Sequence, residues 1–237
     1  MDLGLDGRVA LVTAASRGLG LASARALSAE GARVLVASRD PDHLARASEE
    51  LGPSCATSVA DMNDPEVPAR LVGDAVDRWG RLDVVVANNG GPPAGTALAV
   101  DDDALGAALE ANLMASVRLV KAAAPHMAAN RWGRVCCITS YSVVLPVRTL
   151  ALSNVARAGL YAWARSAASE LLADGITVNL ACPGPHSTDR MKELGGTGPM
   201  GDPGRFGQVV AFLCSEPAAW ITGTTVVVDG GGIATQG

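Results

Sequence analysis

The stretch Arg8 to Gly20, which reads RVALVTAASRGLG, decides how the chain folds. It opens with the apolar run Val9 to Val12, which is typical of a strand buried on both faces of a sheet. A turn of small residues follows at Thr13 to Gly20. A helical pattern begins at once, with one apolar face made of Leu19, Ala22, Ala26 and Leu27.

A strand, a glycine-rich turn and a helix in this order can build a phosphate site. Gly18 and Gly20 let the backbone approach a phosphate closely, and the first N–H groups of the helix point at the anion. The residues expected to line this site are Thr13, Ser16, Arg17, Gly18, Leu19 and Gly20. The alternative is a tight connection between strand and helix that holds no ligand.

The composition is that of one globular domain. Of the 237 residues, 49% are hydrophobic and 18% are charged, which argues against a disordered or a nucleic-acid-binding chain. The net charge of -5 argues against a polyanionic partner. The start does not resemble a signal peptide, and no apolar run reaches the roughly 18 residues that cross a membrane. We therefore expect a cytoplasmic protein of one domain, residues 1–237, without a nucleic acid or a membrane as partner.

The cysteines lie mostly inside apolar strand or helix patterns; they are Cys55, Cys136, Cys137, Cys182 and Cys214. This placement fits reduced thiols in the core of a cytosolic protein better than a disulfide framework. If residues 135–138 form a strand, the adjacent Cys136 and Cys137 point to opposite faces of the sheet. We therefore expect no metal site.

Strand-like and helix-like segments alternate along the chain. The expected strands are Arg8–Thr13, Arg33–Ala37, Ser54–Val59, Asp83–Ala87, Arg134–Thr139, Thr177–Ala181 and Thr224–Val228. The longest helical patterns are Asp102–Asn130 and Leu150–Ala173. This alternation predicts a parallel sheet with helices on both faces and right-handed crossovers. The loosely composed stretch Gly195–Gly204 predicts a mobile loop.

The residues at the end of the second expected strand indicate whether NAD or NADP binds. At this position an acidic residue suits the ribose 2′-hydroxyl of NAD, and a basic residue suits the 2′-phosphate of NADP. Arg39 stands here, and Arg17 in the first turn can reach the same phosphate. Asp40, which precedes Pro41, is expected to cap the next helix. We therefore predict NADP(H) as the cofactor; the alternative is two solvated surface arginines.

Further motifs follow the first turn in a fixed order along nearly the whole chain. They are Asp61-Met62, Asn88-Asn89-Gly90, Asn112, Ser140, Pro183-Gly184, Thr222-Gly223 and Asp229-Gly230-Gly231. Together with the turn itself, they resemble the motifs of the short-chain dehydrogenase/reductase (SDR) family. The turn is similar to that family's TGxxxGxG, with Ala14 in place of the first glycine.

The resemblance implies a single-domain Rossmann-type fold, a doubly wound parallel sheet of about seven strands. It also implies an oxidoreductase similar to 3-oxoacyl-carrier-protein reductases, with Ser140 as the catalytic serine and Asn112 as the active-site asparagine. Asp61 would meet the adenine ring. Members of the family associate through two long helices. The two long helical patterns of this chain, Asp102–Asn130 and Leu150–Ala173, are rich in alanine and have the small faces that such packing needs, so we expect a homodimer or a homotetramer. The alternative is that these alanines pack against the sheet.

This sequence differs from the family's pattern at the two positions of the family's catalytic pair. The family has a Tyr that exchanges a proton with the substrate oxygen and, one helical turn later, a Lys that lowers the pKa of that Tyr and binds the nicotinamide ribose. Ser153 and Arg157 stand at these positions. A serine hydroxyl is a far weaker acid than a tyrosine, whose pKa is about 10. Arg157 can hold the ribose or an anionic substrate group, but it cannot pass a proton on.

Three side chains could supply the proton instead: Tyr141, Tyr161 and His186. Tyr141 directly follows the expected catalytic Ser140. Tyr161 lies two turns beyond Ser153 on the same helix, where packing is the alternative role. His186 follows the Pro-Gly motif, where it could donate a proton near neutral pH or be a solvated loop histidine.

The loop expected to cover the substrate is short, and the side chains near it are partly apolar. A substrate loop near residues 186–204, including the glycine-rich Ser187–Pro203, forms a small lid that excludes less water than a long one. Gly90-Gly91-Pro92-Pro93 is expected to form the opposite, stiffer wall. Apolar side chains at Val143, Val144, Leu145 and Met191 indicate a partly apolar small molecule as the substrate.

Three functions remain open. The first is an NADP-dependent carbonyl reductase or alcohol dehydrogenase, in which Ser140 polarises the oxygen, Asn112 holds a water relay and Arg157 holds the ribose. The second is a non-redox enzyme of the same fold, a dehydratase, isomerase or cyclase, in which Ser140, Ser153 and Arg157 position a polar substrate. The third is a nucleotide-binding regulator without chemistry.

Overall fold

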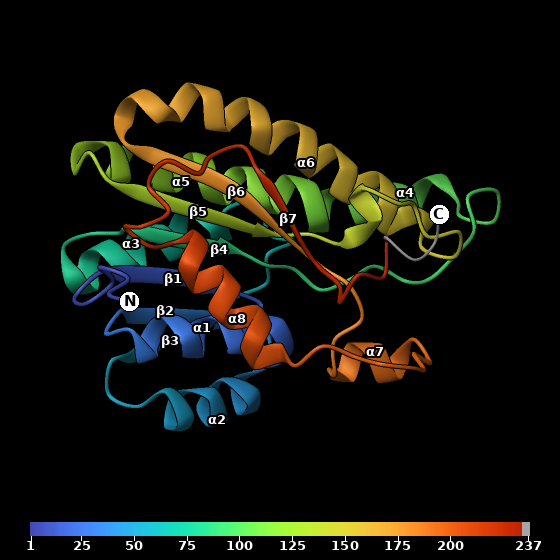
Figure 1. Cartoon of the computed structure of the whole chain (residues 1–237), viewed down its shortest axis with the longest axis horizontal. Coiled ribbons are helices and arrows are strands. Elements are labelled where there is room, and N and C mark those ends of the chain that lie inside the picture. The colour runs from blue at the N-terminus through green and yellow to red at the C-terminus, as the bar shows by residue number, and fades with distance from the viewer. Residues whose placement is uncertain (234–237) are drawn as a thin grey trace.

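A seven-stranded parallel sheet forms the centre of the molecule (Figure 1). The computed structural model describes residues 1–233, so the last four residues of the expected domain, 234–237, lie outside the described part. In chain order the strands are β1 (Val9–Thr13), β2 (Arg33–Ser38), β3 (Cys55–Val59), β4 (Val84–Ala87), β5 (Gly133–Ile138), β6 (Ile176–Pro183) and β7 (Thr225–Val228). Their spatial order is β3-β2-β1-β4-β5-β6-β7, which confirms the predicted doubly wound α/β fold.

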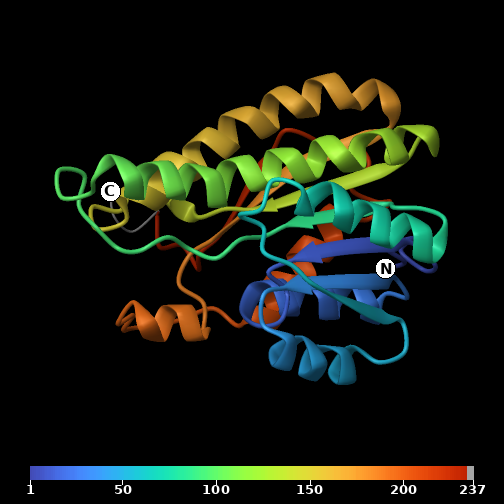
Figure 2. The same cartoon turned by 180° about the vertical axis from the view of Figure 1, so that it is seen from behind.

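Helices cover both faces of this sheet. Figure 1 has α1 (Gly18–Ala29), α2 (Pro41–Leu51) and α8 (Pro203–Leu213) on the near face. Figure 2 shows the opposite face, with α3 (Val67–Trp79), α5 (Ala115–Ala129) and α6 (Ala151–Leu171). None of the helices in residues 1–233 combines the length and the apolar composition that a bilayer span requires.

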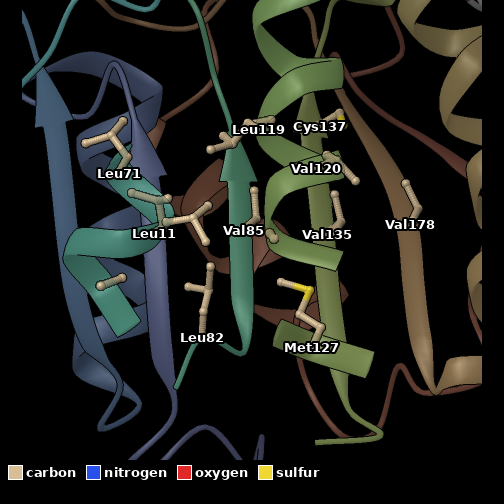
Figure 3. Close-up of a cluster of buried hydrophobic side chains, with 14 of the residues drawn as sticks. Leu11, Leu71, Leu82, Val85, Leu119, Val120, Met127, Val135, Cys137 and Val178 are labelled. Atoms are coloured by element: carbon tan, nitrogen blue, oxygen red, sulfur yellow. The ribbon is translucent and has the colours of Figure 1, made fainter. Parts of the chain in front are cut away.

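Each inner strand contributes to two apolar cores, because successive side chains point to opposite faces. In β1, Val9 and Leu11 belong to the core under α3, α5 and α6, which Figure 3 shows in close-up. Ala10 and Val12 belong to the core under α1 and α8. The strand is fully buried, which confirms the prediction from its continuous apolar run.

The cysteines follow the same alternation. Cys137 lies in the core drawn in Figure 3, and the adjacent Cys136 lies in the core on the other face, as predicted. All five are free thiols, and only Cys55 is not fully buried. Burial raises the pKa of the Cys137 thiol and raises that of Cys182 to about 11, so both stay protonated at neutral pH. Within residues 1–233, His, Cys, Asp and Glu form no group of three that could hold a metal ion.

The segment predicted as one helix, Asp102–Asn130, contains an irregular turn. Between α4 (Asp102–Leu109) and α5, residues Glu110–Met114 form a π-helix, in which each turn is wider than in an α-helix. Asn112 lies in this stretch and is buried. Apolar periodicity does not reveal a single wide turn, because the residues on either side of it show the same helical pattern whether or not the turn is wide.

The segment between β6 and α8 also differs from the expected loop. It contains a short helix, α7 (Asp189–Glu193), which lies beyond the carboxyl ends of the strands (Figure 1). The side chain of Thr188 caps it by accepting a hydrogen bond from the Met191 N–H. Asp189 pairs with Lys192 one turn later at 3.0 Å. The predicted mobile loop Gly195–Gly204 is also too long, because its last two residues, Pro203 and Gly204, begin α8. Mobility of the residues before them stays a prediction.

The helix α8 crosses α1 at very short range. A β-carbon on Gly207 would come within 2.2 Å of the carbonyl oxygen of Ala22, so glycine is required at this crossing. Phe206 and Val210 beside it are fully buried in the same core. The last helix is therefore packed tightly against the helix that follows the glycine-rich turn.

Candidate active site

The turn between β1 and α1 leaves the N-terminus of α1 without a side-chain cap. Arg17 occupies the N-cap position, and its side chain makes no capping hydrogen bond. Ala14 and Gly18 adopt left-handed φ angles of 46° and 59°. At Gly20, a β-carbon would lie 2.5 Å from the carbonyl oxygen of Ala14, so no other residue fits there without displacing the turn. The first-turn N–H groups of α1 can therefore meet an anion.

Two side chains tie this turn to the end of β4. The Thr13 hydroxyl donates to the carbonyl oxygen of Asn88 at 2.7 Å and accepts from the Asn88 N–H at 3.0 Å. The Asn88 amide donates in turn to the carbonyl oxygen of Ala14 at 3.1 Å. Asn89, the next residue, donates to the Ser116 hydroxyl at 2.8 Å, and Gly90 is exposed. These bonds bring the first and fourth strand ends, predicted to share one ligand, into one rigid unit.

The two arginines predicted to meet a 2′-phosphate lie on neighbouring loops. Ser16 and Ser38 hydrogen-bond through their hydroxyls at 2.9 Å, and each precedes one of the arginines. Arg39 is exposed. Arg17 is also exposed and lies 3.9 Å from Asp189 of α7, a distant ion pair that solvent screens. Both guanidinium groups are therefore accessible on the same side of the turn.

The acidic residues near these loops have different roles. Asp40 caps α2 by accepting from the His43 N–H at 2.9 Å, as predicted, and this bond lowers the pKa of the Asp40 carboxyl. Asp61 follows β3, is exposed, and accepts from the Asn63 N–H at 3.1 Å. Met62 is half-buried and packs against the core. An adenine contact by Asp61 and Met62 stays a prediction.

Ser140 follows the end of β5 and is half-buried. Its hydroxyl accepts from the Ser142 N–H at 3.1 Å and so caps a short 3-10 turn, Tyr141–Val143. This capping bond leaves the hydroxyl proton of Ser140 available for a second partner. Tyr141 is half-buried beside it.

Ser153 and Arg157 meet one turn apart on α6. The Arg157 Nε donates to the Ser153 hydroxyl at 3.2 Å, and its Nη1 donates to the carbonyl oxygen of Ile138 at 2.9 Å. Arg157 is only 7% exposed. Burial lowers its pKa to about 10, so the group stays charged at neutral pH. The bond to Ile138 holds the charge of Arg157 at the end of β5, two residues before Ser140.

Asn112 lies in the π-helical stretch with an unsatisfied polar atom. Its side-chain carbonyl oxygen is buried and has no hydrogen-bond partner. Buried acceptors of this kind are rare, and a bound water or ligand commonly supplies the missing donor. This unpaired acceptor is compatible with the water relay at Asn112, which stays a prediction.

The Pro-Gly motif at the end of β6 lies against the strand β7. The Gly184 N–H donates to the carbonyl oxygen of Val228 at 2.9 Å, and a β-carbon on Gly184 would lie 2.6 Å from the β-carbon of Asp229. His186 turns away from solvent: it is 3% exposed, and its Nδ1 bonds to the carbonyl oxygen of Gly184 at 3.0 Å. Its ring meets Phe206 edge-on at 5.2 Å between centroids. These contacts enclose the ring of His186 on several sides.

A family model described as "Enoyl-(Acyl carrier protein) reductase" matches residues 13–232. "Dehydrogenase/reductase SDR family member 4" of Bos taurus is 33% identical over 247 residues, covering 97% of this chain and 88% of the relative. The chain belongs to the short-chain dehydrogenase/reductase family. The "3-oxoacyl-[acyl-carrier-protein] reductase FabG" of Salmonella typhimurium is 32% identical, covering 97% of this chain and 98% of that SDR protein.

A solved SDR structure shares the fold almost completely. It is the L-sorbose reductase from Gluconobacter frateurii, complexed with NADPH and L-sorbose. Its TM-score to this chain is 0.90 at 29% identity, with 97% of this chain and 98% of that chain covered. These relatives support an SDR oxidoreductase that uses a nicotinamide nucleotide.

One further residue at this SDR site escaped the sequence analysis. Arg190 of α7 donates from Nη2 to the carbonyl oxygen of Pro92 at 2.6 Å, which joins the lid to the loop after β4. Its guanidinium lies over Gly91, where a β-carbon would come within 3.2 Å of Nε. The available signal was the capping pattern of Thr188 followed by Asp189, which predicts a helix start inside the presumed loop.

Tyr161 is placed away from the ends of the strands. Its hydroxyl accepts from Nη1 of Arg165 at 2.7 Å, an exposed residue one turn further along α6. Its ring packs at the margin of the core under α6. The structure therefore favours the packing role that was the alternative for this tyrosine.

Proposed function

We propose that this SDR protein is an NADP(H)-dependent oxidoreductase that interconverts a carbonyl and an alcohol on a small, partly apolar molecule, with an atypical active site. The observation that carries this proposal is the turn between β1 and α1. Gly20 is required there by a 2.5 Å approach to the Ala14 carbonyl oxygen, and no side chain caps the helix. Such a turn favours a bound pyrophosphate over a simple connection.

The residues that we assign to the dinucleotide follow the carboxyl ends of five strands of the sheet, where parallel sheets bind such ligands. The first-turn N–H groups of Gly18, Leu19 and Gly20 would hold the pyrophosphate. Arg17 and Arg39 would hold a 2′-phosphate, because both are exposed on loops joined by the bond between Ser16 and Ser38. The remaining contacts would come from Thr13, Asp61, Met62, Asn88, Asn89, Gly90, Pro183 and Gly184. When bound, the nicotinamide ring supplies or accepts the hydride.

We assign the polar groups at the end of β5 to the substrate oxygen. The Ser140 hydroxyl keeps its proton available and would polarise the carbonyl. Arg157 would stabilise negative charge on that oxygen or hold the ribose, and Ser153 would position the Arg157 side chain. We assign no proton transfer to Arg157, because a guanidinium group does not give up its proton in proteins.

The proton would come from Tyr141 or from water at Asn112. Tyr141 is half-buried next to Ser140, and the unpaired carbonyl oxygen of Asn112 can hold a water molecule. His186 is less suited to this task because its Nδ1 is bonded to Gly184 and its ring is enclosed by Phe206. General acid catalysis typically contributes about 10²–10⁴-fold, so a poor donor slows the reaction.

The second candidate is a non-redox SDR enzyme, a dehydratase, isomerase or cyclase. The observation that favours it is the pair of Ser153 and Arg157, which can position a polar group and stabilise charge but offers no acid for a neutral carbonyl. This candidate would not require hydride transfer from the dinucleotide.

The test is a fluorescence titration with NADPH and NADH, followed by a panel of ketones and aldehydes with each cofactor. We expect NADPH to bind more tightly than NADH, and at least one carbonyl to cause cofactor oxidation that Ser140→Ala reduces without changing NADPH affinity. NADPH binding without oxidation by any carbonyl would favour the second candidate or a regulator. Absence of binding to either cofactor would contradict the proposal.

A further inference from the structure

Two guanidinium groups from different layers of the molecule bond near the carboxyl ends of the neighbouring strands β4 and β5. Arg157 comes from α6 and bonds to Ile138 at the end of β5, and Arg190 comes from α7 and bonds to Pro92 in the loop after β4. We propose that these two arginines form an anion pocket that selects substrates carrying a carboxylate close to the reacting carbonyl, as in 2-oxo acids. This inference rests on the proposed function and adds to it a substrate class and a specificity-determining residue, Arg190.

Arg157 is a buried cation without a counter-ion. Within residues 1–233, no Asp or Glu oxygen lies within ion-pair distance of it, and its two partners are the uncharged oxygens of Ser153 and Ile138. Within the same residues its Nη2 has no hydrogen-bond partner, and it is not among the fully buried atoms that lack one, so this nitrogen keeps some exposure. Burying a cation is costly unless an anion compensates it. A substrate anion at Nη2 would supply this compensation.

Arg190 brings a second charge to the same place. Its Nη2 bonds to the Pro92 carbonyl oxygen at 2.6 Å, which holds the side chain against the loop after β4. Gly91 leaves room for the guanidinium, since a β-carbon there would come within 3.2 Å of Nε. Its one acidic partner in the described part of the chain is Glu193, which is half exposed and lies 3.6 Å away, so this pair neutralises the charge only weakly.

The two charges act on each other. The positive charge of Arg190 lowers the pKa of Arg157, in addition to the larger effect of burial. Like charges held together are unfavourable, and a carboxylate between them would relieve both the repulsion and the missing counter-ion. The cofactor phosphates do not meet this need in the proposed binding mode. They would lie at the β1 turn and at Arg17 and Arg39, whereas Arg157 is bonded at the end of β5.

The position of Arg157 also limits where the carboxylate sits on the substrate. Arg157 donates to Ser153 and to Ile138, two residues before the hydroxyl of Ser140 that would polarise the carbonyl. An anion at Nη2 is therefore near the reacting carbon, which suits an acid group on the adjacent carbon rather than at the end of a long chain.

The experiment titrates the protein, with and without NADPH, with short-chain 2-oxo acids and with the methyl ester of each acid. We expect the acids to bind about tenfold tighter than their esters, the effect of one charge-assisted contact. Arg190→Gln should remove most of this preference while leaving ester binding unchanged, and Arg190→Lys should retain part of it. Lys192→Gln is the matched control, because it removes a cation of α7 that pairs with Asp189 instead.

Equal binding of acids and esters, or no binding of either, would overturn the anion pocket. A loss of NADPH affinity in Arg190→Gln would also overturn it, because Arg190 would then serve the cofactor. Failure of NADPH to bind is a separate result that contradicts the proposed function alone. A preference for acids in the protein without NADPH, sensitive to Arg190, would then still support the pocket.

Discussion

The two halves of the sheet use their residues in different ways. In the half formed by β1, β2 and α1, the turn requires a residue without a side chain, because backbone atoms occupy the space that a β-carbon on Gly20 would need. In the half formed by β5, β6 and α6, the site depends on the ends of side chains, Ser140, Ser153 and Arg157. Side-chain ends can change without moving the backbone. The comparison teaches that substitutions are restricted at the turn after β1 by backbone packing, whereas side-chain ends at β5 and α6 can differ on the same backbone.

The largest effect that we expect comes from placing a Tyr and a Lys at positions 153 and 157, where the resemblance to the family predicts them. The double variant Ser153→Tyr, Arg157→Lys places an acid of ordinary phenolic pKa beside an ammonium group that lowers it. Carbonyl-dependent NADPH oxidation should rise about 10²–10⁴-fold over the parent, the range of general acid catalysis. The single Arg157→Lys variant, which adds no acid, is the control. A double variant that binds NADPH but gains no activity would show that the missing acid does not limit the reaction.

The second largest effect that we expect is a loss of NADPH affinity when Gly20, in the turn between β1 and α1, is replaced. Gly20→Ala forces a β-carbon against the Ala14 carbonyl oxygen, which costs about 1–3 kcal/mol as overpacking and displaces the turn. We expect NADPH affinity to fall about 100-fold or more in a fluorescence titration. Gly73→Ala on α3 is the matched control, because nothing lies within 4 Å of its β-carbon position. Unchanged NADPH affinity in Gly20→Ala would contradict a pyrophosphate site at this turn.

A smaller effect separates NADP from NAD. Arg39→Gln removes one exposed guanidinium from the proposed 2′-phosphate site, so the Kd for NADPH should rise roughly tenfold. The Kd for NADH, which has no phosphate there, should stay the same. Arg33→Gln, an exposed arginine at the opposite end of β2, is the control. If both dinucleotides weaken equally, Arg39 supports the loop rather than the phosphate.

The smallest effect tests whether stability and binding can be separated. Asp202 caps α8 by accepting from the Arg205 N–H at 3.0 Å. Asp202→Ala should lower the free energy of unfolding by about 1 kcal/mol, the usual cost of a lost N-cap. Chemical denaturation measures this change, and NADPH affinity in the native protein should be unchanged. A parallel loss of NADPH affinity would indicate that the cap of α8 acts on the turn through α1.

The strands of the sheet, and the turns in the half formed by β1, β2 and α1, could be predicted in detail from the sequence. Strand-like runs predicted all seven strands, and the glycine-rich turn predicted a close approach of the backbone in the first loop. The cap at Asp40 also followed from local pattern, since the residues that make it are neighbours in the chain. Local interactions of this kind are visible in a linear sequence.

The other half was predicted less completely, because its features depend on distant residues. The bond between Arg190 and Pro92 joins positions 98 residues apart, and no local pattern records it. The π-helical stretch at Glu110–Met114 is hidden inside helical periodicity on both sides. The enclosed setting of His186 depends on Phe206 of α8, so exposure of that ring could not be judged from the Pro-Gly motif.

The crossing of α8 over α1 has a consequence for how the protein is made. A ribosome delivers α1 long before α8, and the face of α1 around Ala22 is covered only when Gly207 has left the exit tunnel. The nascent chain must therefore carry an uncovered apolar surface while the residues between these helices are made, the condition under which unfinished chains aggregate or recruit chaperones. A helix made early thus waits for one made much later.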